Sequence, residues 1–101
     1  VSNNILTDIS PASKLTYLAI LSISDNQIED LAPIAHMSYL TTLFASNNQI
    51  ADISPLVENL GIDAGDRVDI TDNPLDCSDP TTLQQLQTLV DRGVQLDESC
   101  L

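Results

Sequence analysis

The sequence predicts an α/β solenoid: short parallel strands form a sheet, tight turns cover its other side, and a helix follows at the C-terminal end. Three observations predict it. The stretch SDNQIEDLAPI at 24–34 returns as SNNQIADISPL at 46–56, 22 residues later. Aliphatic residues alternate before each copy, as in a short strand. The segment 77–101 then changes to helical spacing between two cysteines.

The repeated unit reads L-x-x-L-x-L-x-x-N-x-I-x-D-I-x-P-L. Residues 4–11 fit the same frame, and RVDITDNPL at 67–75 fits it after an offset of three residues. The extra residues lie in NLGIDAGD, which is rich in turn formers. One unit alone cannot bury its strand. We therefore expect the copies to stack about 4.8 Å apart, with Leu21, Leu43 and Val68 adjacent in one aliphatic core.

The other shared positions are explained by backbone hydrogen bonding. An Asn follows each strand, where the chain turns sharply and its side-chain amide can bond backbone groups of neighbouring turns. An Asp then precedes each tight helical turn, where it can accept backbone N–H groups, and a Pro fixes φ. These positions are Asn4, Asn26, Asn48 and Asn73; Asp8, Asp30 and Asp52; and Pro11, Pro33 and Pro55.

The unit matches the leucine-rich repeat signature over residues 4–75. It resembles the 22-residue class found in internalin-type bacterial surface proteins. This resemblance implies a right-handed superhelix whose concave strand face binds a protein, or a glycan, noncovalently. It also implies a larger exported bacterial protein, extracellular or at the cell surface. Residues 1–76 would be the repeats, the first one partial, and residues 77–101 a C-terminal cap.

The predicted cap contains one helix at about 80–92. Asp79 is placed to cap it and Pro80 to begin it, and Gly93 follows Arg92 as a stop signal. Its apolar face is predicted to comprise Leu83, Leu86 and Val90, with Leu89 beside them. Val94 and Leu96 are expected to add a short extended segment.

Cys77 and Cys100 flank this helix, which favours a disulfide over two buried thiols of a cytosolic chain. Closing a loop of about 24 residues would stabilise the fold by about 3.5 kcal/mol. The spacing fits no zinc motif.

Side chains that flank the inward L-x-L residues are expected to face the concave side, because strand side chains alternate. These candidate binding residues form four rows: Ile20, Thr42 and Arg67; Ser22, Phe44 and Asp69; Ser24, Ser46 and Thr71; and Asp25, Asn47 and Asp72.

Phe44 is the one aromatic among these candidates. If exposed it would be a binding hot spot, but the small neighbour Ala45 would also allow Phe44 to enter the core. Arg67 has two interpretations, an ion pair with Asp66 or Asp69, or an anchor for a carboxylate of a partner.

Charge limits the partners. The chain carries 15 acidic and 3 basic residues, a formal charge of −12. Nucleic acid and anionic membranes are therefore poor partners, and cationic partners, a salty medium or simple solubility are favoured. No apolar run reaches the roughly 20 residues of a membrane helix.

The sequence predicts neither an enzyme nor a bound cofactor or metal. His36 has no Cys or His partner nearby and is expected at the surface. The acidic stretch at 63–79 lacks the carboxylate spacing of a calcium loop, although a weak cation site stays open. Two alternatives to a binding module are a structural spacer and an enzyme whose catalytic domain lies elsewhere.

The N-terminal end shows no cap, since residues 1–14 are only the back half of a repeat. We expect further repeats or another domain before Val1, and self-association through the uncapped end if they are missing.

Overall fold

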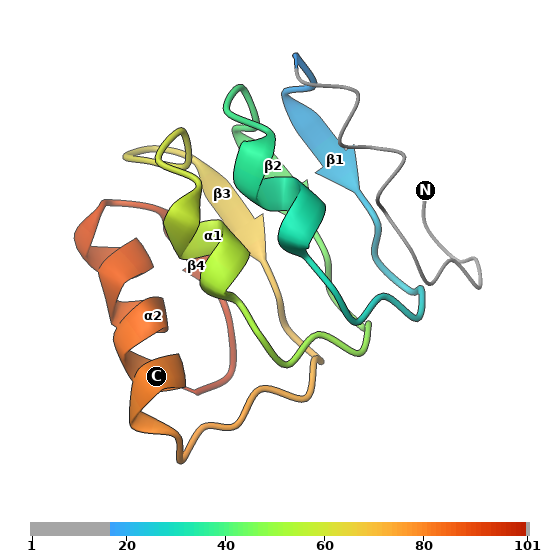
Figure 1. Ribbon diagram of the computed structural model, residues 1–101, viewed down its shortest axis with the longest axis vertical. Coiled ribbons are helices and arrows are strands. Elements are labelled where there is room, and N and C mark those ends of the chain that lie inside the picture. Colours follow the sequence, from blue (N-terminus) through green and yellow to red (C-terminus); the bar gives the residue numbers. More distant parts are fainter. Residues whose placement is uncertain (1–16, 101) are drawn as a thin grey trace.

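The computed structural model describes residues 17–100. Four short strands form one parallel sheet in chain order: β1 (Ile20–Ser22), β2 (Thr42–Phe44), β3 (Arg67–Asp69) and β4 (Gln95–Asp97) (Figure 1). The connections carry a 3-10 helix, η2 (Ala32–His36), and two α-helices, α1 (Ser54–Glu58) and α2 (Pro80–Asp91). The architecture is therefore an α/β repeat. The superhelical handedness and the uncapped N-terminal end stay predictions, and Asn4, Asp8 and Pro11 lie outside the described residues.

The register of the sheet follows the repeat alignment. Leu21 pairs with Leu43 and Leu43 with Val68, and Val68 in turn pairs with Leu96 of β4. These central side chains are inward, and both Leu43 and Val68 are fully buried. The expected adjacency of the first three aliphatic residues is confirmed.

The core is a stack of aliphatic side chains between the sheet and the helical turns. Each coil adds residues at the same repeat positions, and Met37 is buried in the same core. The fully buried set includes Ile23, Ile28, Leu31, Ile34, Leu40, Ile50, Ile53, Leu56, Ile62 and Ile70. Each coil buries its apolar surface mainly against its neighbours, as expected for a repeat architecture.

Buried or partly buried asparagines join consecutive coils at the turns after β2 and β3. The Asn73 side chain donates to the carbonyl oxygens of Ala45 and Ile70, at 3.0 Å each, and its Oδ1 accepts from the backbone of Asn48 at 3.1 Å. Asn48 makes the equivalent bonds one coil earlier, including one to Ile23. This ladder satisfies backbone groups that would otherwise be buried without partners.

The turns opposite the sheet also follow the prediction. Asp30 Oδ1 accepts from the N–H of Ala32 at 2.8 Å, and Asp52 Oδ1 from the N–H of Ser54 at 2.9 Å. Proline then occupies one of the first two positions of η2 and of α1, where no intrahelical donor is needed.

The three extra residues before β3 are accommodated by a second buried amide. Asn59 Nδ2 donates to the carbonyl oxygens of Ile34 and Met37, at 2.8 and 2.9 Å. Gly61 then passes so close to the preceding coil that a Cβ there would lie 2.2 Å from the carbonyl oxygen of Ser38. The insertion is therefore tied to the coil before it.

The C-terminal unit comprises α2 and β4. Asp79 Oδ1 accepts from the N–H of Thr81 at 3.0 Å, as expected of an N-cap. The buried residues of α2 are Thr82, Leu86 and Leu89. The prediction that Val90 lies on the buried face is wrong, because its side chain is 43% exposed and Leu89 occupies the inner position one residue earlier.

Two contacts tie this unit to the repeats. α2 packs beside α1, and the Arg92 guanidinium donates to the carbonyl oxygens of Val57 at 2.6 Å and Ile62 at 3.5 Å (Figure 1). The predicted disulfide between Cys77 and Cys100 is confirmed, with Cα atoms 5.2 Å apart.

Candidate binding surface

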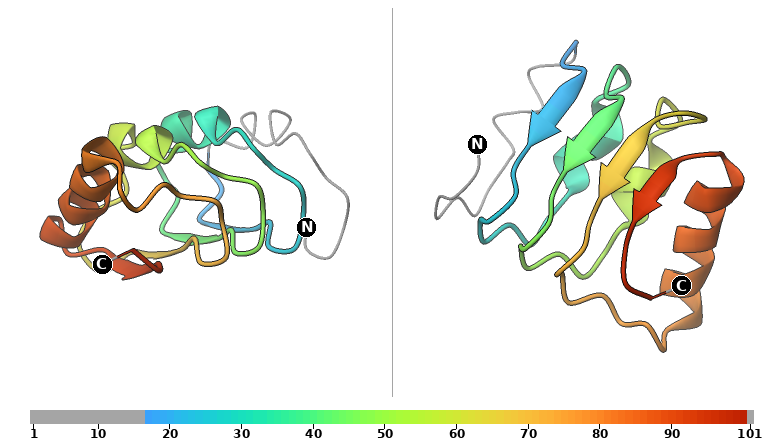
Figure 2. Two further views of the ribbon diagram at one scale, coloured as in Figure 1. Left: turned by 90° about the horizontal axis from the view of Figure 1, so that it is seen from below. Right: turned by 180° about the vertical axis from the view of Figure 1, so that it is seen from behind.

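Within residues 17–100, no helix covers one face of the sheet. The helical elements all lie on the opposite side, as both views in Figure 2 show. The strand side chains that point away from those helices define what we call the open sheet face. It comprises Ile20, Ser22, Thr42, Phe44, Arg67, Asp69, Gln95 and Asp97.

Phe44 lies on this face. It is only partly buried, whereas its neighbours Leu43 and Ala45 are completely buried and belong to the core. Alternation along the strand leaves no way for Phe44 to point inward as well. Ala45 therefore fills the core position that the larger Ile23 and Ile70 occupy in the adjacent coils. The structure thus decides between the two interpretations of Phe44 in favour of the outward one.

Arg67 joins three strands. Its guanidinium carbon lies 5.6 Å from the centroid of the Phe44 ring on β2, and its Nη2 donates to Asp97 Oδ2 on β4 at 2.8 Å. The prediction that Arg67 pairs with Asp66 or Asp69 is wrong. The Asp66 carboxylate accepts from the backbone of Asp63, and Asp69 accepts from Thr71 instead.

The exposed fractions of the Arg67 and Asp97 side chains, 50% and 46%, decide what the ion pair contributes. Solvent screens a pair of this kind, so we expect about 0–1 kcal/mol of stabilisation. The contact between guanidinium and ring adds roughly 0.5–1 kcal/mol at an exposed site. The contacts among Phe44, Arg67 and Asp97 therefore order the surface more than they stabilise the fold.

Polar side chains continue the face beyond the strand ends. Ser46 donates to the hydroxyl of Ser24 at 3.1 Å, and Thr71 follows in the same row. In the next row, Asp25, Asn47 and Asp72 have left-handed backbones, with φ of 61°, 56° and 57°.

Asp and Asn tolerate that conformation better than other non-glycine residues. Asn47 Nδ2 donates to Asp25 Oδ1 at 2.9 Å, which connects two coils at this margin. The repeat frame had placed the row without revealing its backbone conformation.

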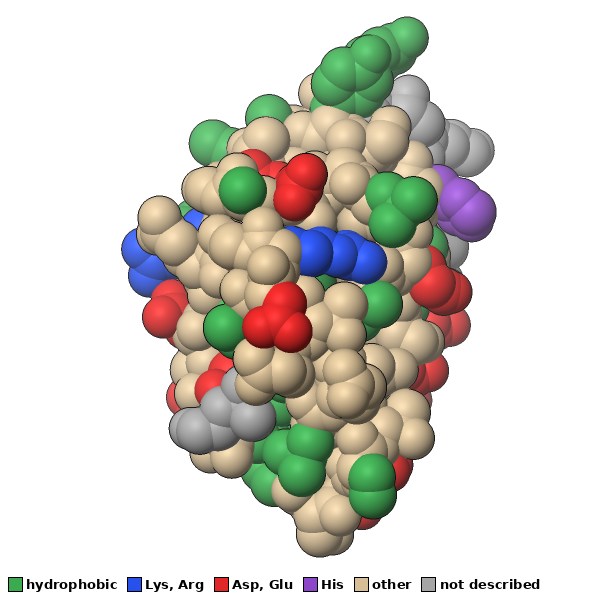
Figure 3. All heavy atoms as spheres, turned by 90° about the vertical axis from the view of Figure 1, so that its left-hand side faces the viewer, with side chains coloured by type: hydrophobic (Ala, Val, Ile, Leu, Met, Phe, Trp, Pro, Cys, Tyr) green, Lys and Arg blue, Asp and Glu red, His purple; other side chains and the backbone are tan. Residues whose placement is uncertain are grey.

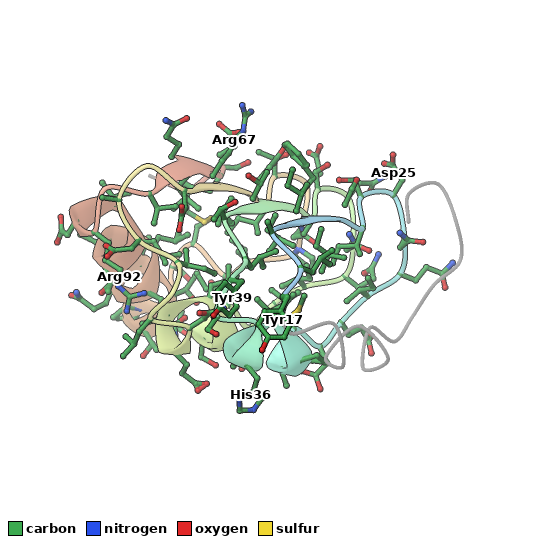
Figure 4. All side chains as sticks on the ribbon, turned by 90° about the horizontal axis from the view of Figure 1, so that it is seen from above. Tyr17, Asp25, His36, Tyr39, Arg67 and Arg92 are labelled. Atoms are coloured by element: carbon green, nitrogen blue, oxygen red, sulfur yellow. A yellow bond between two sulfur atoms is a disulfide. The ribbon has the colours of Figure 1, made fainter. Side chains whose placement is uncertain are left out.

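Sequence reasoning missed two parts of the surface. Gln95 extends the row of Arg67 by one strand, and Asp97 extends the row of Asp69. The aliphatic Leu96 between them could have indicated a fourth strand. Tyr17, Tyr39 and Leu60 are also prominently exposed, and the two tyrosine rings lie 5.0 Å apart (Figure 4). That exposed pair lies away from the open sheet face.

Within residues 17–100, no three His, Cys, Asp or Glu side chains gather as a metal site requires. His36 is exposed on η2 (Figure 4). Hydrogen bonds from the side chain and backbone of Ser78, and one from the backbone of Asp79, lower the pKa of the Asp76 carboxyl.

Acidic side chains are scattered over the face shown in Figure 3, among few basic ones. No described helix is long and apolar enough to cross a membrane.

No protein-family model matches the chain, and no curated protein does. A solved structure does: internalin C2 from Listeria monocytogenes str. 4b F2365, 35% identical to this chain, with a TM-score of 0.74. The match covers 97% of this chain but only 40% of that one. The chain therefore has an α/β repeat fold similar to part of internalin C2, a leucine-rich repeat protein.

Proposed function

We propose that this chain is a noncovalent binding module, of the 22-residue internalin class, within a larger exported bacterial protein. Its open sheet face recognises a protein or, as the second choice, a glycan. One observation carries the proposal: a face left bare by every helix of the described part of the chain presents Phe44 and Ile20 among ordered polar side chains. Exposed apolar residues rimmed by polar ones are typical of binding surfaces.

The remaining features support the proposed setting. A disulfide is typical of proteins that fold in an oxidising compartment, which favours an extracellular or cell-surface location. The segment 77–101 acts as a C-terminal cap in this proposal, because α2 and β4 cover the last repeat and the disulfide joins the ends of the unit. No step of covalent chemistry is assigned to the chain.

The alternative is a structural spacer between other domains. It is favoured by the many small polar residues on and beside the face, among them Ser22, Thr42 and Ser24. A spacer needs no ligand. Substitutions on the open sheet face would then change the solubility of the chain and no binding affinity.

The two functions are separated by screening the chain against purified extracellular proteins and a glycan array. Phe44→Ala is the test variant and Val90→Ala, on the exposed side of α2, is the matched control. A binding module predicts a ligand whose affinity falls at least about tenfold with Phe44→Ala and less than about twofold with the control. Melting temperatures of both variants would be compared with the parent chain. If every ligand found is indifferent to Phe44→Ala, the proposal is wrong.

A further inference from the structure

We propose that the open sheet face recognises a basic protein segment, one that carries Lys or Arg residues next to an apolar side chain. The inference rests on the proposed binding function and specifies its partner. Three features of the face support it: unbalanced charge, the ordered Asp25 carboxylate and exposed apolar surface.

The charge is unbalanced. Four carboxylates lie on the open sheet face or at its margin: Asp25, Asp69, Asp72 and Asp97. The single cation among them, Arg67, is paired with Asp97. Within residues 17–100, the other three carboxylates form no ion pair, so the face keeps a net negative charge that a cationic partner would neutralise.

One of these carboxylates, that of Asp25, is held in place before any partner arrives. Asp25 and Asp72 share the left-handed conformation described above, and Asn47 lies between them and donates to Asp25. Two strand spacings, roughly 10 Å in all, separate the outer residues of this row. Asp25 lies apart from Arg67 in Figure 4, so its carboxylate is separate from the pair of Arg67 and Asp97. A fixed acceptor such as Asp25 reduces the ordering cost of binding.

Apolar surface lies on the face that the row of Asp25, Asn47 and Asp72 borders. Ile20 is 60% exposed on β1, and Phe44 lies on the next strand. A partner with cationic groups alone would leave this surface in water, whereas one with an adjacent aliphatic side chain would cover it. The overall charge of −12 would speed the encounter with such a partner and oppose polyanions.

The test uses three synthetic peptides as probes: alternating Lys and Leu, alternating Ser and Leu, and alternating Glu and Leu. Binding to the disulfide-bonded chain is followed by chemical-shift changes of its backbone amides. We expect the Lys-Leu peptide to shift amides of β1, β2 and β3, with affinity that falls as salt is added. The other two peptides should bind at least tenfold more weakly.

The matched variants remove equal charge from different places. Asp25→Asn with Asp72→Asn keeps the acceptor oxygens and the left-handed preference, and we expect it to weaken Lys-Leu binding about fivefold. Glu29→Gln with Glu58→Gln removes two exposed carboxylates away from the open sheet face and should change affinity less than twofold.

Each other outcome has a definite meaning. Equal weakening by the two double variants would show attraction to overall charge, and the inference would be overturned. A neutral ligand that depends on Phe44, with no Lys-Leu binding, would overturn the inference and leave the proposed function standing. If no ligand shifts any amide of the face, both are wrong.

Discussion

The substitution Asn48→Ala tests whether the buried asparagine ladder holds the coils together. Asn48 is 2% exposed. Its Nδ2 donates to the carbonyl oxygens of Ile23, Ala45 and Ser46, at 3.0, 3.1 and 3.2 Å, and its Oδ1 accepts from the N–H of Ile28 at 3.1 Å. One side chain thus connects the turns of two coils and provides the acceptor for the backbone N–H of Ile28, which precedes η2.

The expected cost follows from which groups keep a partner. After truncation, Asn26 still donates to the Ile23 carbonyl and Asn73 to that of Ala45. The buried N–H of Ile28, however, loses its acceptor. An orphaned buried donor costs roughly 1–3 kcal/mol, and the lost bonds add about 1 kcal/mol. We therefore expect Asn48→Ala to lower the free energy of unfolding by about 3 kcal/mol.

Urea unfolding followed by circular dichroism measures this loss. The control is Gln49→Ala, the next residue, whose side chain is exposed and whose backbone bond is kept. It should change stability by less than about 0.5 kcal/mol. If Asn48→Ala changes stability no more than the control, at an unchanged denaturant slope, then the ladder does not hold the coils together and the reasoning fails.

Three further predictions concern single features. Replacing both Cys77 and Cys100 by Ser should lower the free energy of unfolding by about 3.5 kcal/mol, as measured by urea unfolding of the variant and the disulfide-bonded chain. Gly61→Ala should lower the melting temperature, because the new methyl group would overlap a backbone carbonyl oxygen; an unchanged value would contradict the close approach. Ser78→Ala should raise the pKa of Asp76, measured by NMR titration. Because that pKa is lowered in the folded chain, the stabilisation from Asp76 is present above its unfolded pKa and is lost as pH falls through the folded one.

The sequence alone determined the repeating part of this protein. Residues 22 apart have equivalent surroundings in a stack of coils, so the period placed Leu21 beside Leu43 and, across the three-residue insertion, Leu43 beside Val68. The Asn48 bonds and the Asp52 turn were also predictable, because each depends on local backbone groups that recur in every coil.

Only the tertiary structure decided how unlike side chains meet across the coils. Arg67 pairs with Asp97, 30 residues later, because β4 joins the sheet beside β3, and no periodic pattern encodes that pairing. Asn59 likewise finds its acceptors in the preceding coil because the insertion folds back there. Repeated residues meet repeated surroundings and can be predicted from spacing. The residues that differ between coils have neighbours that only the tertiary packing determines. The proposed binding surface consists mostly of such residues.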